Sequence, residues 1–117
     1  MQEQFENLKV WQKAMDLVTQ IYEETKNLPE KEAYGLTSQM RRASVSIPSN
    51  IAEGKGRFHN KERIQFNYMA RGSVYELITL IQVAKNLKYL NPSKTEILIK
   101  LCQEISAMLN GLIQSIK

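Results

Sequence analysis

The sequence predicts an all-α protein, an antiparallel up-and-down four-helix bundle formed by a single domain over residues 1–117. Four segments carry apolar residues at intervals of three and four, which is the pattern of an amphipathic helix. The connections between them are short and contain Pro, Gly or Asn, and no segment alternates like a strand. A chain of this length buries about two thirds of its unfolded surface, so its core can form without a disulfide or a metal.

The first predicted helix is strongly amphipathic and is followed by an acidic connection from Pro29 to Glu32. We expect Asn7 to cap its first turn, because the side-chain oxygen can accept from free backbone amides there. Pro29 marks its end. The predicted core stripe consists of Leu8, Trp11, Ala14, Met15, Val18, Ile21, Tyr22, Thr25 and Leu28.

The second predicted helix contains a proline, Pro48, inside its apolar stripe. Proline removes one helical hydrogen bond and crowds the carbonyl four residues earlier, which usually kinks or breaks a helix. The stripe keeps its phase across Pro48, so we predict one helix kinked at the proline. It ends near Gly56, where glycine is expected in a left-handed cap. The stripe consists of Leu36, Met40, Ala43, Ile47, Ile51 and Gly54.

The third predicted helix begins with Asn60 as a cap and runs to about Tyr89, where Asn91 and Pro92 stop it. Its core stripe consists of Phe66, Met69, Ala70, Ser73, Leu77, Leu80, Ile81, Ala84 and Leu87. Ser93 and Glu96 form a predicted capping box at the start of the fourth helix. The fourth stripe consists of Leu98, Leu101, Cys102, Ile105, Met108, Leu109, Leu112 and Ile116.

A second line of residues on the third helix faces away from its core stripe, and consists of Ile64, Tyr68, Arg71, Tyr75 and Ile78. A helix with two apolar faces either lies inside a larger core or contacts another subunit, and a four-helix bundle has no central helix. We therefore favour an oligomer interface here. The alternative is that both lines belong to one wide core-facing surface.

The net charge of +4 is concentrated in one part of the chain. Residues 40–72 hold seven basic and two acidic residues, a local charge of +5, whereas residues 1–39 carry a net charge of −3. Basic side chains neutralise phosphates, and exposed aromatic rings stack on unpaired bases. The candidate nucleic-acid contacts are Arg41, Arg42, Lys55, Arg57, Lys61 and Arg63, and the alternative is a solvated basic face.

The inventory of reactive side chains argues against an enzyme, a metal site or a bound cofactor. His59 lies among cationic residues without a second ligand at metal spacing, and Cys102 falls within an apolar stripe. We expect Glu53 to pair with an arginine of another helix or subunit rather than to transfer protons. The chain also lacks a signal-like or membrane-spanning segment, so we expect a cytoplasmic protein.

Three stretches carry a family resemblance: QMRRASVSIPSNIAEGKGR at residues 39–57, LKVWQKA near the start, and MARGSVYEL in the third helix. They resemble the 23S rRNA intervening-sequence proteins, bacterial proteins encoded within insertions in ribosomal RNA genes and sometimes labelled ribosomal proteins. The resemblance extends from Phe5 to about Ile116. It implies a four-helix bundle that assembles into a homopentameric ring. A related branch, the accessory proteins of diversity-generating retroelements, works with a reverse transcriptase and RNA.

The leading functional prediction is therefore a non-enzymatic, oligomeric bundle that binds ribosomal or other RNA with little sequence specificity. A reverse transcriptase becomes an expected partner if the gene lies in a retroelement. The alternative is a protein-interaction scaffold whose basic residues form salt bridges between subunits. An RNA-processing enzyme ranks third, because no catalytic cluster is visible.

Overall fold

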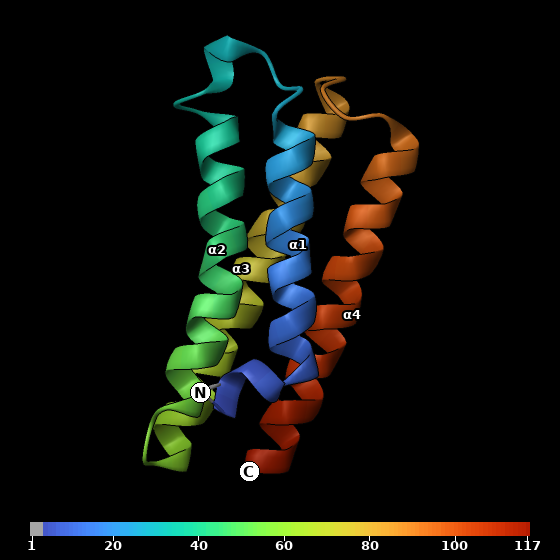
Figure 1. Ribbon diagram of the computed structural model, residues 1–117. Helices are drawn as coiled ribbons and strands as arrows, with labels where there is room; N and C mark the ends of the chain where they lie inside the picture. Colours follow the sequence, from blue (N-terminus) through green and yellow to red (C-terminus); the bar gives the residue numbers. More distant parts are fainter. Residues whose placement is uncertain (1–3) are drawn as a thin grey trace.

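Four long helices run alternately up and down the molecule in the computed structural model, which describes residues 4–117 (Figure 1). They are α1 (Lys9–Thr25), α2 (Leu36–Lys55), α3 (Asn60–Asn86) and α4 (Pro92–Ile116). Two short 3₁₀ helices, η1 (Gln4–Asn7) and η2 (Glu30–Glu32), precede α1 and α2. The described residues contain no strand. The predicted all-α four-helix architecture is confirmed.

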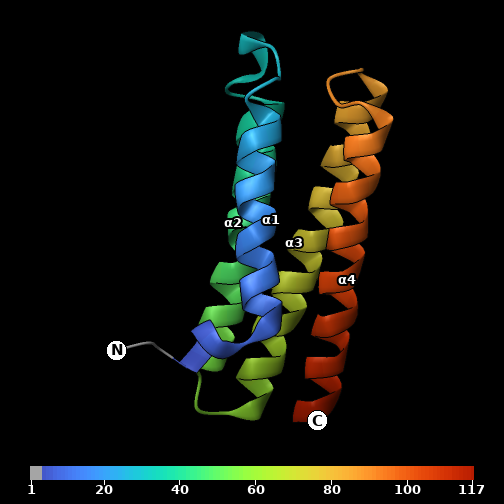
Figure 2. The ribbon, with the colours of Figure 1, turned by 45° about the vertical axis from the view of Figure 1, so that its right-hand side comes forward.

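Helices that follow one another along the chain pack side by side, and α4 also packs against α1, which closes the bundle. No Cα atoms of the diagonal pairs, α1 with α3 and α2 with α4, lie within 8 Å of each other, so the core is the space that the four helices enclose (Figure 2). Fully buried aliphatic side chains from every helix fill it, among them Leu17, Ile47, Leu77 and Ile105. None of the described helices is long and apolar enough to cross a membrane.

The predicted stripe of α2 is confirmed in full, since all six of its residues are buried. The helix continues through Pro48 without a break, and Pro48 itself is buried. Polar side chains around the proline bond to the helix backbone: Ser44 Oγ donates to the Arg41 carbonyl, and Asn50 Nδ2 to that of Ser46. Neither bond reaches the Ser44 carbonyl, which is the one that Pro48 leaves without its helical donor. The kink at Pro48 stays a prediction.

The predicted stripe of α1 is partly right. Ala14, Ile21, Thr25 and Leu28 are buried, but the helix also buries Val10 and Leu17, which the stripe omitted. Met15 and Tyr22, predicted in the core, keep about two fifths of their surface exposed, at 42% and 39%. The reason is that apolar residues occupy neighbouring rows over nearly half of the circumference of α1, so periodicity alone does not select which row faces the core. The helix also ends at Thr25, four residues before Pro29.

Similar slips occur on α3 and α4. Met69 and Leu87 were predicted in the core of α3 but are exposed, and α3 ends at Asn86 rather than near Tyr89. On α4 the predicted stripe omitted Ile113, which is buried. The other stripe residues of these two helices are buried or half-buried.

The predicted N-caps of three helices were wrong. Asn7 lies in η1, and α1 starts after Leu8 without a side-chain cap. Asn60 is the first residue of α3, and its N-cap, His59, makes no capping hydrogen bond. At α4 the cap is Asn91, whose Oδ1 accepts from the Lys94 amide at 2.8 Å.

The α4 start lies two residues earlier than the Ser93–Glu96 box implied. Pro92 occupies the first helical position, where its fixed φ suits a helix and its missing N–H has no partner to lose. This start places Asn91 at the N-cap, a position where asparagine is strongly preferred. Ser93 and Glu96 have the spacing of a capping box, but the helix begins at Pro92 because Asn91 and Pro92 suit the N-cap and the first helical position.

The predicted left-handed glycine after α2 was also wrong. Gly56 has a φ of −80° and no glycine has a positive φ. Within residues 4–117 the left-handed residue is Lys88, with a φ of 67°, just after α3. Its amide donates to the Lys85 carbonyl at 2.9 Å, and the Tyr89 amide to that of Ala84 at 2.8 Å. These two bonds form a Schellman motif that closes α3.

Candidate nucleic-acid interface

The six basic candidates fall into two groups, one in α2 and one around the turn from α2 into α3. Arg41 and Arg42 lie in the upper half of α2, whereas Lys55, Arg57, Lys61 and Arg63 surround the turn between α2 and α3 at the lower end of the molecule. Arg42 and Lys55 are thirteen residues apart in one helix, or about 20 Å. The six residues therefore do not form one compact patch.

Arg41 connects α2 to α1 rather than extending into solvent. Its guanidinium lies over the ring of Tyr22, 4.6 Å from the centroid, and its Nε donates to Thr25 Oγ1 at 2.9 Å. Arg42 is exposed and, within residues 4–117, forms no ion pair. Arg41 thus has a packing role, and Arg42 is an isolated surface charge.

Two arginines stabilise the lower turn by local contacts. Arg57 pairs with Glu53, Nη2 to Oε2 at 2.9 Å, and its guanidinium stacks over the Phe66 ring at 4.7 Å. Arg63 Nε donates to the Arg57 carbonyl at 2.6 Å. The expected pairing of Glu53 with an arginine is present, although the partner follows in the same turn rather than on another helix or subunit. Both arginines hold the conformation of the chain between α2 and α3.

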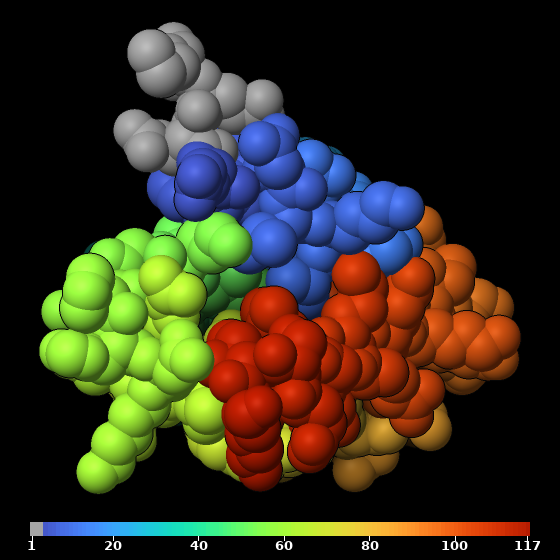
Figure 3. Space-filling model, turned by 90° about the horizontal axis from the view of Figure 1, so that it is seen from below, coloured from blue at the N-terminus to red at the C-terminus, as the bar shows by residue number. Residues whose placement is uncertain are grey.

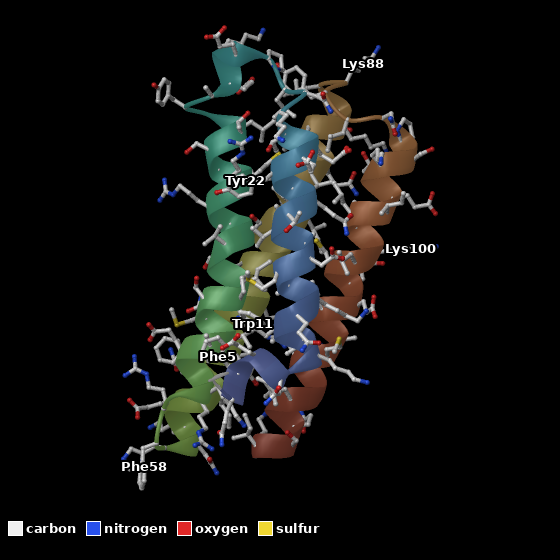
Figure 4. The ribbon with its side chains drawn as sticks, in the orientation of Figure 1. Phe5, Trp11, Tyr22, Phe58, Lys88 and Lys100 are labelled. Atoms are coloured by element: carbon white, nitrogen blue, oxygen red, sulfur yellow. The ribbon has the colours of Figure 1, made fainter. Side chains whose placement is uncertain are left out.

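Lys55 and Lys61 lie on either side of this turn without a carboxylate partner. Both are exposed, and the described part of the chain places no acidic oxygen within 4 Å of either ammonium group. Between them Phe58 is 86% exposed and extends from the tip of the turn (Figure 4). The His59 ring meets Phe58 edge to face, with centroids 5.1 Å apart. The turn presents an aromatic ring flanked by two available cations.

A hollow lies next to this turn, where α2, α3, the start of α1 and the end of α4 meet (Figure 3). Its volume is about 180 Å³. The residues that line it are Leu8, Ile51, Gly54, Lys55, Arg63, Asn67, Leu112, Ser115 and Ile116. It therefore combines aliphatic walls with two cationic residues already present in the basic turn.

Asn67 is a lining residue that sequence reasoning missed. It is 3% exposed, and its Nδ2 donates to the Arg63 carbonyl at 3.0 Å. Its Oδ1 has no hydrogen-bond partner among the described residues. Because Asn67 precedes the buried Ala70 and Val74 by three and seven positions, helical spacing did carry a signal that it faces inward.

The predicted interface line on α3 is present at the surface. Arg71 lies over two tyrosines, 4.8 Å from the centroid of Tyr68 and 5.8 Å from that of Tyr75. Its Nη1 also donates to Asn110 Oδ1 on α4 at 2.9 Å. The two rings remain exposed, whereas Ile64 and Ile78 at the ends of the line are half-buried. Part of this line thus belongs to the bundle, as the alternative interpretation held.

A second apolar surface lies between α1 and α2. It is an open groove of about 300 Å³ lined by Trp11, Met15, Val18, Val45, Pro48, Ser49 and Ala52. Three of these residues are ones that the α1 prediction placed in the core. The apolar face of α1 therefore contributes some residues to the core and others to this exposed groove.

Cys102 is buried in α4, and this burial raises the pKa of its thiol to about 12. The thiol is therefore protonated at neutral pH, the less reactive form. Within residues 4–117 no three His, Cys, Asp or Glu side chains gather as metal ligands would.

These features define an antiparallel four-helix bundle with one basic, aromatic end. The sequence model of the 23S rRNA-intervening sequence proteins matches residues 6–111, and the chain belongs to this family. A crystal structure of a protein of unknown function from the S23 ribosomal protein family of Bacteroides thetaiotaomicron is similar, with a TM-score of 0.83 and 21% identity. The match covers 89% of this chain and 97% of that one. No curated protein matches the sequence.

Proposed function

We propose that this protein binds RNA, without catalysis and with little sequence specificity, through the turn between α2 and α3. The observation that carries the proposal is the pair of unpaired cations, Lys55 and Lys61, on either side of the exposed Phe58. Lysines that neutralise phosphates release counterions, and this supplies most of non-specific binding energy. An aromatic ring adds about 1–3 kcal/mol for each base that stacks on it.

The division of roles within the basic candidates follows from their contacts. Arg57 and Arg63 hold the turn, so they position Phe58 and the lysines, whereas Lys55 and Lys61 contact phosphate. Arg42 adds a more distant charge along α2. Arg41 contributes little, because its guanidinium is committed to Tyr22 and Thr25.

The experiment measures binding of a fluorescent single-stranded RNA by anisotropy at increasing salt. Lys55→Glu/Lys61→Glu is the test variant. Lys31→Glu/Lys88→Glu is the matched control, because it makes the same charge change on exposed lysines at the opposite end. We expect the test variant to lose at least about tenfold in affinity at low salt and to lower the salt slope by about one per lysine. Unchanged binding by the test variant would contradict the assignment.

We also propose that the protein self-associates, as a homopentamer, through its exposed apolar surfaces. The α1–α2 groove and the exposed tyrosines of α3 support this, since exposed apolar patches commonly mark contact surfaces. A closed ring would repeat the basic turn in every subunit and strengthen RNA binding by avidity. Light scattering coupled to size-exclusion chromatography tests this; a strict monomer at micromolar concentration contradicts it.

The second candidate is a protein-interaction scaffold without direct RNA binding. The apolar groove favours it, because a protein partner would bury Met15 and Val45, whose side chains are partly exposed there. A stable oligomer that shows no RNA binding at low salt would support this candidate and exclude the first.

A further inference from the structure

We propose that the hollow beside the basic turn is a binding site for one unpaired pyrimidine base of the bound RNA strand. This inference rests on the proposed RNA-binding function and deepens it, because it names where a base would be held. It follows from three properties of the hollow: its size, the buried acceptor of Asn67, and the cations at its edge.

The size of the hollow suits a single six-membered ring. Its volume of about 180 Å³ is slightly larger than the engineered apolar cavity of about 150 Å³ that takes up benzene. Leu8, Ile51, Leu112 and Ile116 supply aliphatic walls against which the faces of a ring can pack. A purine, with two fused rings, is a poorer fit to this volume.

Asn67 supplies the polar group that orients the ring. Its Nδ2 is engaged with the Arg63 carbonyl, which identifies the unpartnered atom as Oδ1, a hydrogen-bond acceptor. A buried acceptor without a partner is costly, and native proteins rarely retain one without a reason. Oδ1 itself has less than 1 Å² of accessible surface, so a base in the hollow reaches it only when the Asn67 amide turns toward the hollow. The N3–H of uracil or the amino group of cytosine would then donate to it. A pyrimidine therefore satisfies the atom that the fold leaves unsatisfied.

The edge of the hollow supplies the charge that a nucleotide requires. Lys55 lines it, so a base inserted between the aliphatic walls would bring its phosphate toward this cation, while Arg63, which also lines the hollow, holds the turn. Phe58 lies on the same turn and would stack a neighbouring base of the strand. The hollow and the turn thus form one surface, in which the strand is held by its backbone and one base is inserted.

The test compares a short oligouridylate with an abasic strand of the same length, both fluorescently labelled, by anisotropy at low salt. Ser115→Trp fills the mouth of the hollow, and Gln114→Trp places the same ring on an exposed neighbouring position that does not line it. Asn67→Leu removes the acceptor while keeping the side-chain size. Circular dichroism and thermal unfolding confirm that each variant is folded.

We expect Ser115→Trp and Asn67→Leu each to weaken oligouridylate binding about fivefold or more and to leave binding of the abasic strand unchanged. Gln114→Trp should change neither. Oligoadenylate should be insensitive to Ser115→Trp, because its bases do not enter the hollow. If both variants bind oligouridylate as the wild type does, the base site is excluded while RNA binding stands. If the wild type binds neither strand, the proposed function fails, and this inference fails with it.

Discussion

The two ends of the bundle differ in how completely their polar groups are satisfied. At the upper end, Asn91 caps α4, a Schellman motif closes α3, and the Tyr89 hydroxyl donates to Glu32 Oε2 at 3.1 Å. At the lower end, α3 starts without a side-chain cap, and the Asn67 acceptor has no described partner. These hydrogen bonds at the upper end thus serve the fold, whereas the buried acceptor without a described partner lies at the lower end.

We expect the largest difference in stability between the two ends from a substitution at Gly54, where α2 and α3 approach closely at the lower end. A Cβ there would lie 3.0 Å from the Cβ of Phe66 and 3.3 Å from the Arg63 carbonyl oxygen. Gly54→Ala should therefore lower the free energy of unfolding by about 1–3 kcal/mol, measured by urea titration.

Gly111→Ala is the matched control for Gly54→Ala. Gly111 also lies in a helix, but a Cβ there would meet nothing within 4 Å, so this variant should gain about 0.5–1 kcal/mol of stability. If both alanine variants are equally stabilised, the close approach of the two helices at Gly54 is not a constraint.

At the upper end the cap of α4 gives the next largest effect. Asn91→Ala removes the acceptor for the Lys94 amide and should cost about 1 kcal/mol in the free energy of unfolding. Ser93→Ala should change it by less than about 0.5 kcal/mol, because Ser93 is an exposed residue inside the helix. A larger loss of stability for Ser93→Ala than for Asn91→Ala would instead support the Ser93–Glu96 capping box that the sequence predicted.

The Schellman motif offers a smaller effect of opposite sign. Lys88 holds a φ of 67°, which suits glycine, so Lys88→Gly should stabilise the protein by about 0.5–1 kcal/mol. Lys85→Gly, three residues earlier in the regular helix, should destabilise it by a similar amount. Thermal unfolding of the two variants distinguishes them, and a loss of stability in both would argue against the left-handed conformation at Lys88.

The smallest effect concerns the pH behaviour of the upper end. Burial, followed by the hydrogen bond and charge of Glu32, raises the pKa of Tyr89. A raised pKa in the folded state means that this contribution to stability is present below pH 10 and declines as the pH rises further. Ultraviolet titration should show that Glu32→Gln lowers the pH at which Tyr89 ionises, and Tyr89→Phe identifies the signal of this tyrosine. Identical titrations of the wild type and Glu32→Gln would contradict the Glu32 contact.

The sequence predicted α2 better than α1 for a physical reason. The core row of α2 is flanked by serine, arginine and asparagine, so one stripe stands out, and all of it is buried. In α1 apolar residues occupy adjacent rows, and the helix exposes Met15 and Tyr22 while burying Leu17. Hydrophobic spacing identifies a helix reliably, but it selects the buried face only where the polar residues leave a single choice.

The candidate site was predictable in position and not in detail. Local charge indicated residues 40–72, and the lower turn lies within this range. The sequence did not separate the arginines that hold the turn from the lysines that remain available, because that depends on contacts such as the Arg63–Arg57 bond. Asn67 was missed because a polar residue on an apolar helix row is ordinarily assigned to the surface.

Cross-linking of a short RNA containing 4-thiouridine, followed by mass spectrometry, tests most directly whether the lower end is the RNA-binding end. The contrast between the ends predicts cross-links on the α2–α3 turn, around Phe58, and on residues that line the adjacent hollow, such as Ser115. Cross-links concentrated on η2 or on the turn between α3 and α4, with none around Phe58, would contradict the account.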